Sequence, residues 1–200
     1  MSQPILERKA APGDILEELR DVLSNAATIS PDAITSPPET VDALKADGSD
    51  SFTLAAFTVA DAIDLGHRLH TRLAPLAAQG KPTLINISLA SGPTLFQVAT
   101  GPGVTPDNET WVARKRASVL RFGTSTWLLH CKFGGDEGLF AAKYGLGPEQ
   151  AGRYAIHGGG VPIRVAGVEG VVAVVVVSGL KQHEDHGVIV DVIRKGWKQV

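Results

Sequence analysis

The clearest hydrophobic pattern lies in the last quarter of the chain. Val171 to Val177 is an apolar run, VVAVVVV, between Gly170 and the pair Ser178-Gly179. A run of β-branched residues without alternation is typical of a strand that is covered on both faces. Val161 to Ala166 predicts a second strand, and the short glycine-bounded segment between the two predicts an antiparallel hairpin.

An amphipathic helix is predicted after this hairpin. Val188, Val192, Ile193 and Trp197 recur at helical spacing. Lysines near the C-terminal end of this pattern favour the negative end of a helix dipole. The hairpin and the start of the helix together form one supersecondary unit, from His157 to His186.

The N-terminal quarter combines one helix with a segment of irregular composition. Apolar residues between Ile5 and Leu23 recur at helical spacing, and Pro12 and Asp14 favour a helix start near Gly13. Asn25 to Asp50 is rich in Ser, Thr, Asp and Pro and predicts an extended arm. We therefore expect residues 1–50 to be a helix and an arm, and residues 51–200 to be the main domain.

The middle of the chain alternates strands and helices. Ser51 to Phe57 predicts a strand, and Thr58 can cap the helix that follows. Its apolar face is predicted to hold Val59, Ile63, Leu65, Leu69, Leu73 and Leu76. Lys81 to Leu89 and Pro93 to Thr100 alternate on either side of Ser91-Gly92 and predict a second hairpin.

Helices dominate the stretch between the two hairpins. Glu109 to Arg121 predicts a helix with Val112 and Leu120 on its buried face. Thr124 to Tyr154 suggests short helices separated by glycine-rich turns, with a strand as the alternative for Thr126 to Phe133. The order of one strand and two hairpins favours an α/β fold with a mainly antiparallel, five-stranded sheet and helices on both faces.

Composition narrows the class of protein. The chain has 200 residues, 44% of them hydrophobic, and a net charge of −2, which gives no electrostatic reason to expect nucleic acid or an anionic membrane as a partner. Its one cysteine, Cys131, cannot form an internal disulfide, and the N-terminus lacks the layout of a secretory signal. The longest apolar run is far shorter than the roughly 20 residues that span a bilayer. We expect a soluble, cytoplasmic protein.

Several groups of residues, in the same order along the chain, are similar to those of a known family. They are Asp107-Asn108-x-x-Trp111-x-x-Arg114-Lys115-Arg116, Arg121-Phe122-Gly123-x-Ser125, His157-Gly-Gly-Gly-x-Pro162-Ile163 and Val177-Ser178-Gly179-Leu180-x-Gln182-x-x-Asp185-His186. With them the chain resembles the cytosolic branch of the haem-degrading (HbpS-like, GlcG-like) superfamily, a domain of unknown function, from about Ser51 to Trp197. The resemblance implies a profilin-like three-layer α/β/α sandwich that forms homo-oligomers. No haem-ligand motif can be carried over to this chain.

Candidate ligand-binding residues lie in two of these groups and in the helix before them. Gly158, Gly159 and Gly160 could let backbone N–H groups approach an anion, or could simply form a loop before the strand. Gln182, Asp185 and His186 lie at the predicted start of the last helix, where Asp185 could also be a plain cap. The implied fold could bring His157 and His186 into one pocket, where imidazoles titrate near neutral pH.

Cationic residues and metal ligands give further candidates. Lys115 and Arg116 are favoured for gripping a carboxylate or phosphate, with a solvated helix face as the alternative. His183 and His186 are spaced for metal binding, but no further ligands are evident, so no metal is expected. We interpret Trp111, Trp127 and Cys131 as structural, and Ser125 and Ser178 lack the context of a hydrolase nucleophile.

The sequence favours a homo-oligomer that binds a small anionic or planar ligand, with the cofactor unidentified and catalysis undecided. If there is a reaction, His157 or His186 would carry the proton and Arg116 would stabilise charge. The alternative is an oligomeric adaptor for protein partners, with the N-terminal helix and arm, or the exposed C-terminal tail, as a docking element. Haem binding or haem degradation comes third.

Overall fold

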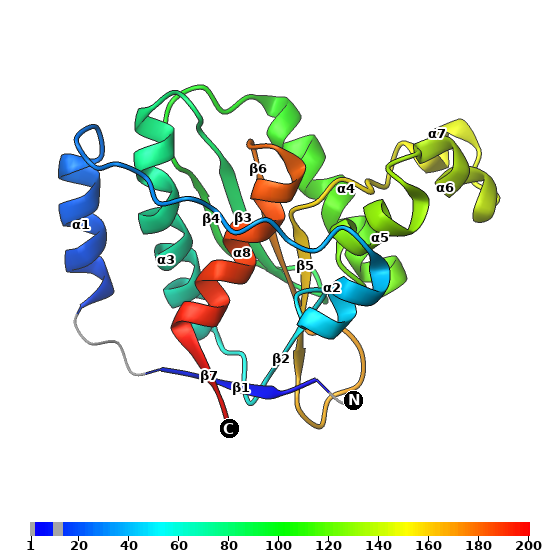
Figure 1. Ribbon diagram of the computed structural model, residues 1–200, viewed down its shortest axis with the longest axis horizontal. Coiled ribbons are helices and arrows are strands. Elements are labelled where there is room, and N and C mark those ends of the chain that lie inside the picture. Colours follow the sequence, from blue (N-terminus) through cyan, green and yellow to red (C-terminus); the bar gives the residue numbers. More distant parts are fainter. Residues whose placement is uncertain (1–2, 10–13) are drawn as a thin grey trace.

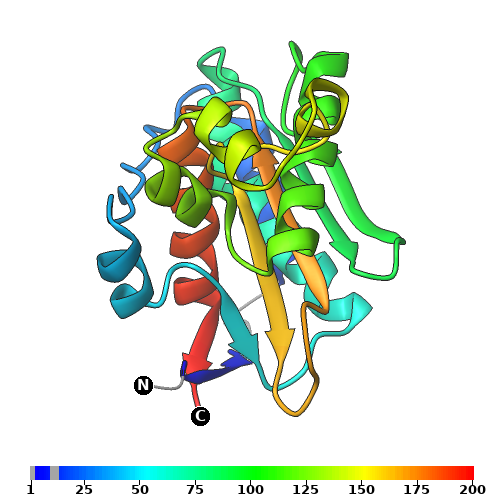
Figure 2. The same ribbon diagram turned by 90° about the vertical axis from the view of Figure 1, so that its right-hand side faces the viewer.

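In the part of the chain that the structure describes, a mixed, seven-stranded β-sheet with helices on both faces is the centre of the molecule (Figure 1). The computed structural model describes residues 3–9 and 14–200. Figure 2 shows the sheet between α8 (Gln182–Gly196) on one side and α4 (Pro106–Phe122) on the other. The expected α/β class with helices on both faces is confirmed.

The sheet has the strand order β4-β3-β6-β5-β2-β1-β7 within the described residues. Its strands are β1 (Ile5–Arg8), β2 (Phe52–Leu54), β3 (Leu84–Leu89), β4 (Thr94–Ala99), β5 (Gly160–Val165), β6 (Ala173–Ser178) and β7 (Trp197–Gln199). Both predicted hairpins, β3–β4 and β5–β6, are present and antiparallel, and β3 joins them by pairing with β6. The β1–β2 and β2–β5 pairs are parallel.

The expectation of five mainly antiparallel strands is therefore wrong, because β1 and β7 extend the sheet. β1 has four residues, of which only Leu6 is half-buried, so it carries no alternating pattern. β7 has three residues and follows α8 without a turn, so Trp197 looked like a continuation of the helical pattern. The two strands pair with each other, from Leu6 opposite Gln199 to Arg8 opposite Trp197.

The described residues form six other helices, and all but α2 match a predicted segment, with shifts at their ends. They are α1 (Ile15–Asn25), α2 (Val41–Asp47), α3 (Val59–Ala78), α5 (Thr126–Phe133), α6 (Glu137–Lys143) and α7 (Pro148–Ala151). Asp14 caps α1 by accepting from Leu16 N, whereas Pro12 and Gly13 lie outside the described residues. The strand alternative for Thr126 to Phe133 is wrong, and α2 interrupts the segment that was predicted to be extended.

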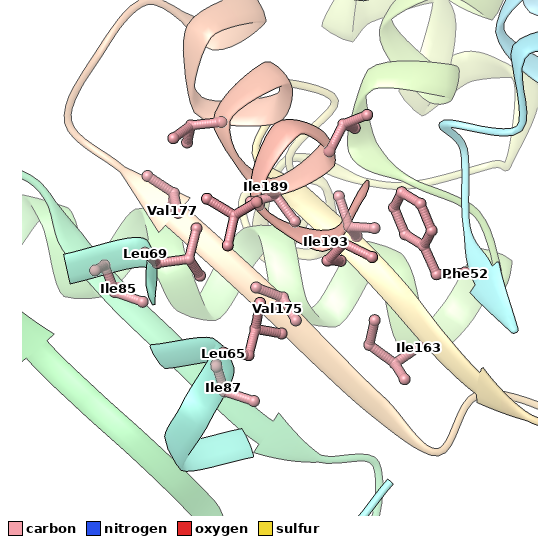
Figure 3. Packing of buried hydrophobic residues seen from close by; sticks show 14 of the residues in the cluster. Phe52, Leu65, Leu69, Ile85, Ile87, Ile163, Val175, Val177, Ile189 and Ile193 are labelled. Carbon is pink, nitrogen blue, oxygen red and sulfur yellow. The ribbon is translucent and has the colours of Figure 1, made fainter. Parts of the chain in front are cut away.

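Alternate side chains of β6 pack on opposite faces of the sheet. Val175 and Val177 face the core under α3 and α8, whereas Val174 and Val176 pack with residues of α4. Figure 3 shows the larger core, where Leu65 and Leu69 of α3 meet Ile189 and Ile193 of α8. Burial on both faces explains the unbroken apolar run. Two residues of the predicted α3 face are instead exposed, namely Val59 and Ile63.

Segment 34–50 runs across α8 and is held by polar contacts. Thr35 N donates to Asp191 Oδ2 at 3.0 Å, and the guanidinium of Arg194 lies 2.8 Å from Asp47 Oδ2. A Cβ atom on Gly187 would lie 2.2 Å from Thr35 O, so glycine permits this close crossing. The division of the chain at residue 50 stays a prediction, although β1 and the main domain share one sheet.

Candidate functional site

A cleft of about 660 Å³ lies where β6 ends and the first turns of α4 and α8 meet. Figure 1 shows these two helices starting beside the end of β6, at the top of the view. The residues around the cleft come from all three elements and from the segment before β5. They are Thr105, Asp107, Asn108, Trp111, Lys115, His157, Ser178, Gly179, Leu180, Lys181, Gln182, His183 and Asp185.

An ion pair that is almost entirely buried contributes to the cleft wall. Lys115 Nζ lies 2.9 Å from Asp185 Oδ2, and the side chains are 3% and 4% exposed. The same ammonium donates to Val177 O at 2.9 Å, and Leu180 N donates to Asp185 Oδ1. Burial raises the pKa of the Asp185 carboxyl, and the Lys115 charge opposes this shift. The pair joins α4, β6 and α8 at one point.

Helical spacing places three cleft residues on one face of α4. Asn108, Trp111 and Lys115 follow the i, i+3, i+7 pattern that aligns side chains along a helix. Asn108 Nδ2 also donates to Ser178 O at 3.2 Å, which fixes the first turn of α4 against the end of β6.

His157 lies at the side of the cleft against Trp111. Their ring centroids are 4.8 Å apart at an interplanar angle of 65°, and His157 Nδ1 lies 3.6 Å from Glu137 Oε1. Partial burial lowers the pKa of His157, while the Glu137 carboxylate opposes this shift. The imidazole is therefore mainly neutral at pH 7 and can accept a proton. Arg114 also lies over the indole, with its Cζ 4.5 Å from the Trp111 centroid.

The first turn of α8 supplies another part of the cleft wall. Lys181 N donates to Glu184 Oε2 at 3.1 Å, so Glu184 caps the helix start. Gln182 Oε1 is buried and has no hydrogen-bond partner among the described residues. The first-turn N–H groups of a helix lack intrahelical acceptors, so this end favours negative charge.

The three glycines before β5 are packed against protein atoms. A Cβ on Gly158 would lie 2.3 Å from Gln182 O, and a Cβ on Gly159 would lie 2.7 Å from Lys115 Nζ. Gly160 N donates to Thr126 Oγ1 at 2.9 Å. The glycines thus allow the chain to pass closely between α4, α5 and α8, and they lie beneath the cleft residues.

Two other predicted ligand residues lie apart from the cleft. Arg116 donates to Ser88 Oγ and to Leu89 O, both at 2.8 Å, and so binds the sheet. His186 is fully buried, with Nε2 3.0 Å from Ser49 O. Burial lowers its pKa to about 4, so this imidazole is neutral at pH 7. The structure brings together Lys115, His157, Gln182 and Asp185.

Sequence reasoning missed several cleft residues for which a signal was present. Asn108, Trp111 and Ser178 belong to the groups that carried the family resemblance, and helical spacing relates the first two to Lys115. Trp111 was interpreted as structural because an isolated tryptophan is more common in a core or interface. The position of Trp111 on the same helix face as Asn108 and Lys115, rather than its residue type, indicates that it lines the cleft.

The described residues contain neither a metal-binding cluster nor a membrane-spanning helix. No group of three or more His, Cys, Asp or Glu side chains in residues 3–9 and 14–200 is arranged to hold a metal ion. In the same ranges, no helix combines the length and apolar character required to cross a membrane. A cation, a neutral imidazole, an indole and helix N–H groups are what the cleft offers to a ligand.

Comparison with known proteins agrees with the resemblance. The chain is 39% identical over 162 residues to a UPF0303 protein of Streptomyces avermitilis, covering 79% of this chain and 91% of the relative. It is 37% identical over 136 residues to the UPF0303 protein YBR137W of Saccharomyces cerevisiae, covering 66% of this chain and 71% of the relative.

Solved structures show the same fold. The crystal structure of the Ybr137w protein has a TM-score of 0.67 at 28% identity, covering 88% of this chain and 94% of that one. The structure of HbpS has a TM-score of 0.51 at 17% identity, covering 70% and 89%, and supports the fold alone. The family model described as haem-degrading protein HbpS-like matches residues 57–194. The chain thus belongs to the HbpS-like family, with UPF0303 proteins of unknown function among its relatives.

Proposed function

We propose that this protein binds a small anionic ligand, carrying a carboxylate or a similar group, in the cleft between α4 and α8. The observation that carries the proposal is the buried Lys115–Asp185 pair at the cleft. Removing two charges from water costs several kcal/mol per ion, and apolar residues often stabilise a fold as well or better. A pair kept at the edge of a cleft is better explained by ligand recognition than by stability.

The arrangement of backbone dipoles supports an anion. The first turns of both α4 and α8 contribute to the cleft wall, and each helix has a positive N-terminal end. Lys181 and His183 add two side chains that can donate hydrogen bonds. Asp107 and Asp185 counter part of this field, so a ligand with one or two negative charges fits better than a highly charged one.

The proposed ligand can also have a planar part. Trp111 and His157 are aromatic, and they contact each other at the same side of the cleft. Aromatic rings favour stacked or edge-to-face contacts with a second ring. Gln182 Oε1, which is buried and has no partner in the part of the chain that the structure describes, would accept a hydrogen bond from such a ligand.

Haem fits this cleft poorly. A porphyrin needs broad apolar walls, whereas Trp111 and Leu180 are the large apolar side chains around the cleft. His157 and His183 could approach an iron atom, but neither is enclosed by apolar side chains in this wall. The family description therefore does not extend to a haem site in this cleft.

Binding is proposed ahead of catalysis. If a reaction takes place, His157 is the candidate proton carrier, since it is half-exposed and mainly neutral at pH 7. We also propose a cytoplasmic homo-oligomer. Its sheet ends in the edge strands β4 and β7, which could pair with another copy.

Native mass spectrometry of the protein purified from its own cells tests the proposal. We expect a small-molecule mass on the wild-type chain that is lost from a His157→Ala, Gln182→Ala variant. His70→Ala is the matched control, because His70 is half-buried and lies outside the cleft. Far-ultraviolet circular dichroism verifies that each variant is folded.

Three other outcomes would contradict the proposal in different ways. A ligand mass that persists in the cleft variant would place the ligand elsewhere. Protein partners without a small molecule would favour the adaptor function. A Soret shift on titration with haem that depends on His157 would favour haem despite the polar cleft.

A further inference from the structure

A second cavity, of about 450 Å³, lies between α1, α3 and α8. In Figure 1, α1 lies beside α3, away from the first turn of α4. The wall of this cavity is formed by α1, by segment 29–32, by one face of α3 and by the end of α8. It shares no residue with the cleft described above.

Part of the cavity wall is apolar, with contributions from α1, α3 and α8. Ile15 and Val22 of α1, Ile29, Pro75 and Val192 contribute apolar surface. Leu19 is the buried residue of α1, while Ile15 and Val22 are only partly buried. The helix thus turns part of its apolar face towards a space that the side chains of the described residues do not fill. A ligand with an apolar body would complete this burial.

The α3 side of the cavity is cationic. Arg68, Thr71, Arg72 and Pro75 follow the i, i+3, i+4, i+7 pattern and share one helix face. Arg68 is paired with Asp64 at 2.7 Å, but Arg72 donates only to the carbonyl oxygens of Asp32 and Ala33 among the described residues. Neutral carbonyl groups leave the positive charge of Arg72 uncompensated.

Two further groups favour an acidic ligand. The hydroxyl oxygen of Thr71 is buried and has no hydrogen-bond partner among residues 3–9 and 14–200. The exposed ammonium of Lys195 stands at the same wall. Glu18 and Asp32 are also part of the wall. Water screens these two exposed carboxylates as it screens the exposed Lys195, so the less exposed Arg72 and Thr71 carry the preference for an acidic ligand.

We infer that this cavity is a binding site for a small amphipathic carboxylate. Its apolar body lies between α1 and α3, and its carboxylate is near Arg72, Thr71 and Lys195. A guanidinium and an ammonium recognise a carboxylate, and a free hydroxyl donates to it. The ligand therefore packs α1 more firmly against α3.

Isothermal titration calorimetry of the full chain with decanoate tests the inference. We expect saturable binding of one decanoate per chain and weaker binding of decanol. Val22→Trp places a larger side chain at the wall and should weaken binding about tenfold or more, because several apolar contacts are lost together. Lys195→Gln should weaken it about two- to fivefold, the effect of one exposed ion pair.

Matched variants separate this site from the rest of the surface. Lys143→Gln makes the same charge change on α6, outside both cavities, and should leave binding unchanged. His157→Ala alters the other cleft and should also have no effect. Hydrogen exchange gives an independent readout, since decanoate should slow exchange of the amides of Ile15–Asn25.

Three results would overturn the inference. The first is the absence of saturable decanoate binding. The second is equal binding of decanol and decanoate, which would mean apolar contact without carboxylate recognition. The third is loss of binding in His157→Ala with no change in Val22→Trp, which would place decanoate in the other cleft.

Discussion

The two ends of the β5–β6 hairpin are both rich in glycine, but their surroundings differ. At one end, Gly158 to Gly160 lie among α4, α5 and α8, and added Cβ atoms would clash with protein atoms. At the other end, an added Cβ on Gly167 or Gly170 has no neighbour within 4 Å in the described residues. The first end needs glycine for space, with a positive φ angle at Gly159 as well, whereas the second needs it for positive φ angles alone.

The same contrast holds for polar groups. The end at Gly158 to Gly160, which we call the closed end because packed helices surround it, buries Lys115, Asp185 and His186. The turn end, at Gly167 to Gly170, exposes Val168 at 53%. Buried polar groups need partners, so each change at the closed end should cost more than a change at the turn. Glycine in a sequence does not distinguish the two roles, since only the packed neighbours do.

The largest expected loss comes from breaking the buried ion pair. Lys115→Met leaves the Asp185 carboxylate buried without its cation, which should lower the free energy of unfolding by about 3–5 kcal/mol. Urea denaturation measures this loss. In a Lys115→Met, Asp185→Asn variant the charge is absent and Leu180 N keeps an acceptor, so part of the stability should return. A double variant that is no more stable than the single one would contradict an electrostatic cause.

The next largest effect tests the space beneath the cleft. In Gly159→Ala the new Cβ would lie 2.5 Å from Val177 O and 2.7 Å from Asp185 Cβ, on a backbone with φ of 109°. Overpacking and strain together should cost about 3 kcal/mol. Gly167→Ala has φ of 78° and open space, so only strain remains, at about 1 kcal/mol. Equal melting temperatures for Gly159→Ala and Gly167→Ala would mean that the two hairpin ends do not differ in the space around their glycines.

His186 should make the closed end sensitive to acid. Burial lowers its folded-state pKa from 6.5 to about 4, so the unfolded chain binds the proton more readily. The contribution of neutral His186 to the free energy of unfolding is complete above pH 6.5, and it is lost as the pH falls towards 4. The loss due to His186 should reach about 3 kcal/mol.

The comparison with His186→Gln isolates this histidine. Glutamine can still donate to Ser49 O, but it does not titrate, so the free energy of unfolding should fall less between pH 6.5 and pH 4. His70, His130 and His157 also have lowered pKa values, and they contribute equally to both chains. Parallel stability curves for wild type and variant would show that His186 is not the cause.

The long periodic elements could be predicted from the sequence, and the short ones could not. The β5–β6 run and α3 have strong patterns because each buries a continuous apolar face. β1 and β7 pair with each other across almost the whole length of the chain. Their few residues gain stability from that pairing rather than from a local pattern. The parallel β1–β2 and β2–β5 pairs join strands that are far apart in the sequence, so no local pattern indicates them.

The candidate site was predictable where one helix face or one turn holds its residues. Lys115 and Asp185 were singled out separately, but their 2.9 Å contact joins residues 70 positions apart. Arg116 is adjacent to Lys115 in sequence and points to Ser88 instead, because successive helix residues diverge by about 100°. His157 and His186 were expected in one pocket, yet the packing of α8 against segment 34–50 encloses only the second.

The smallest expected effect concerns the rim of the closed end. Glu137 is half-exposed, and its carboxylate raises the pKa of His157 against the larger effect of burial. Glu137→Gln should therefore lower the pKa of His157 further, because the favourable charge is lost while Lys115 and Arg114 remain. The 3.6 Å separation and the access of water keep this change small. The imidazole resonances in a pH titration by nuclear magnetic resonance measure it. Glu149→Gln is the matched control, since Glu149 pairs with Arg153 on the surface. A His157 pKa that rises in Glu137→Gln, or that shifts equally in both variants, would mean that Glu137 does not tune this histidine.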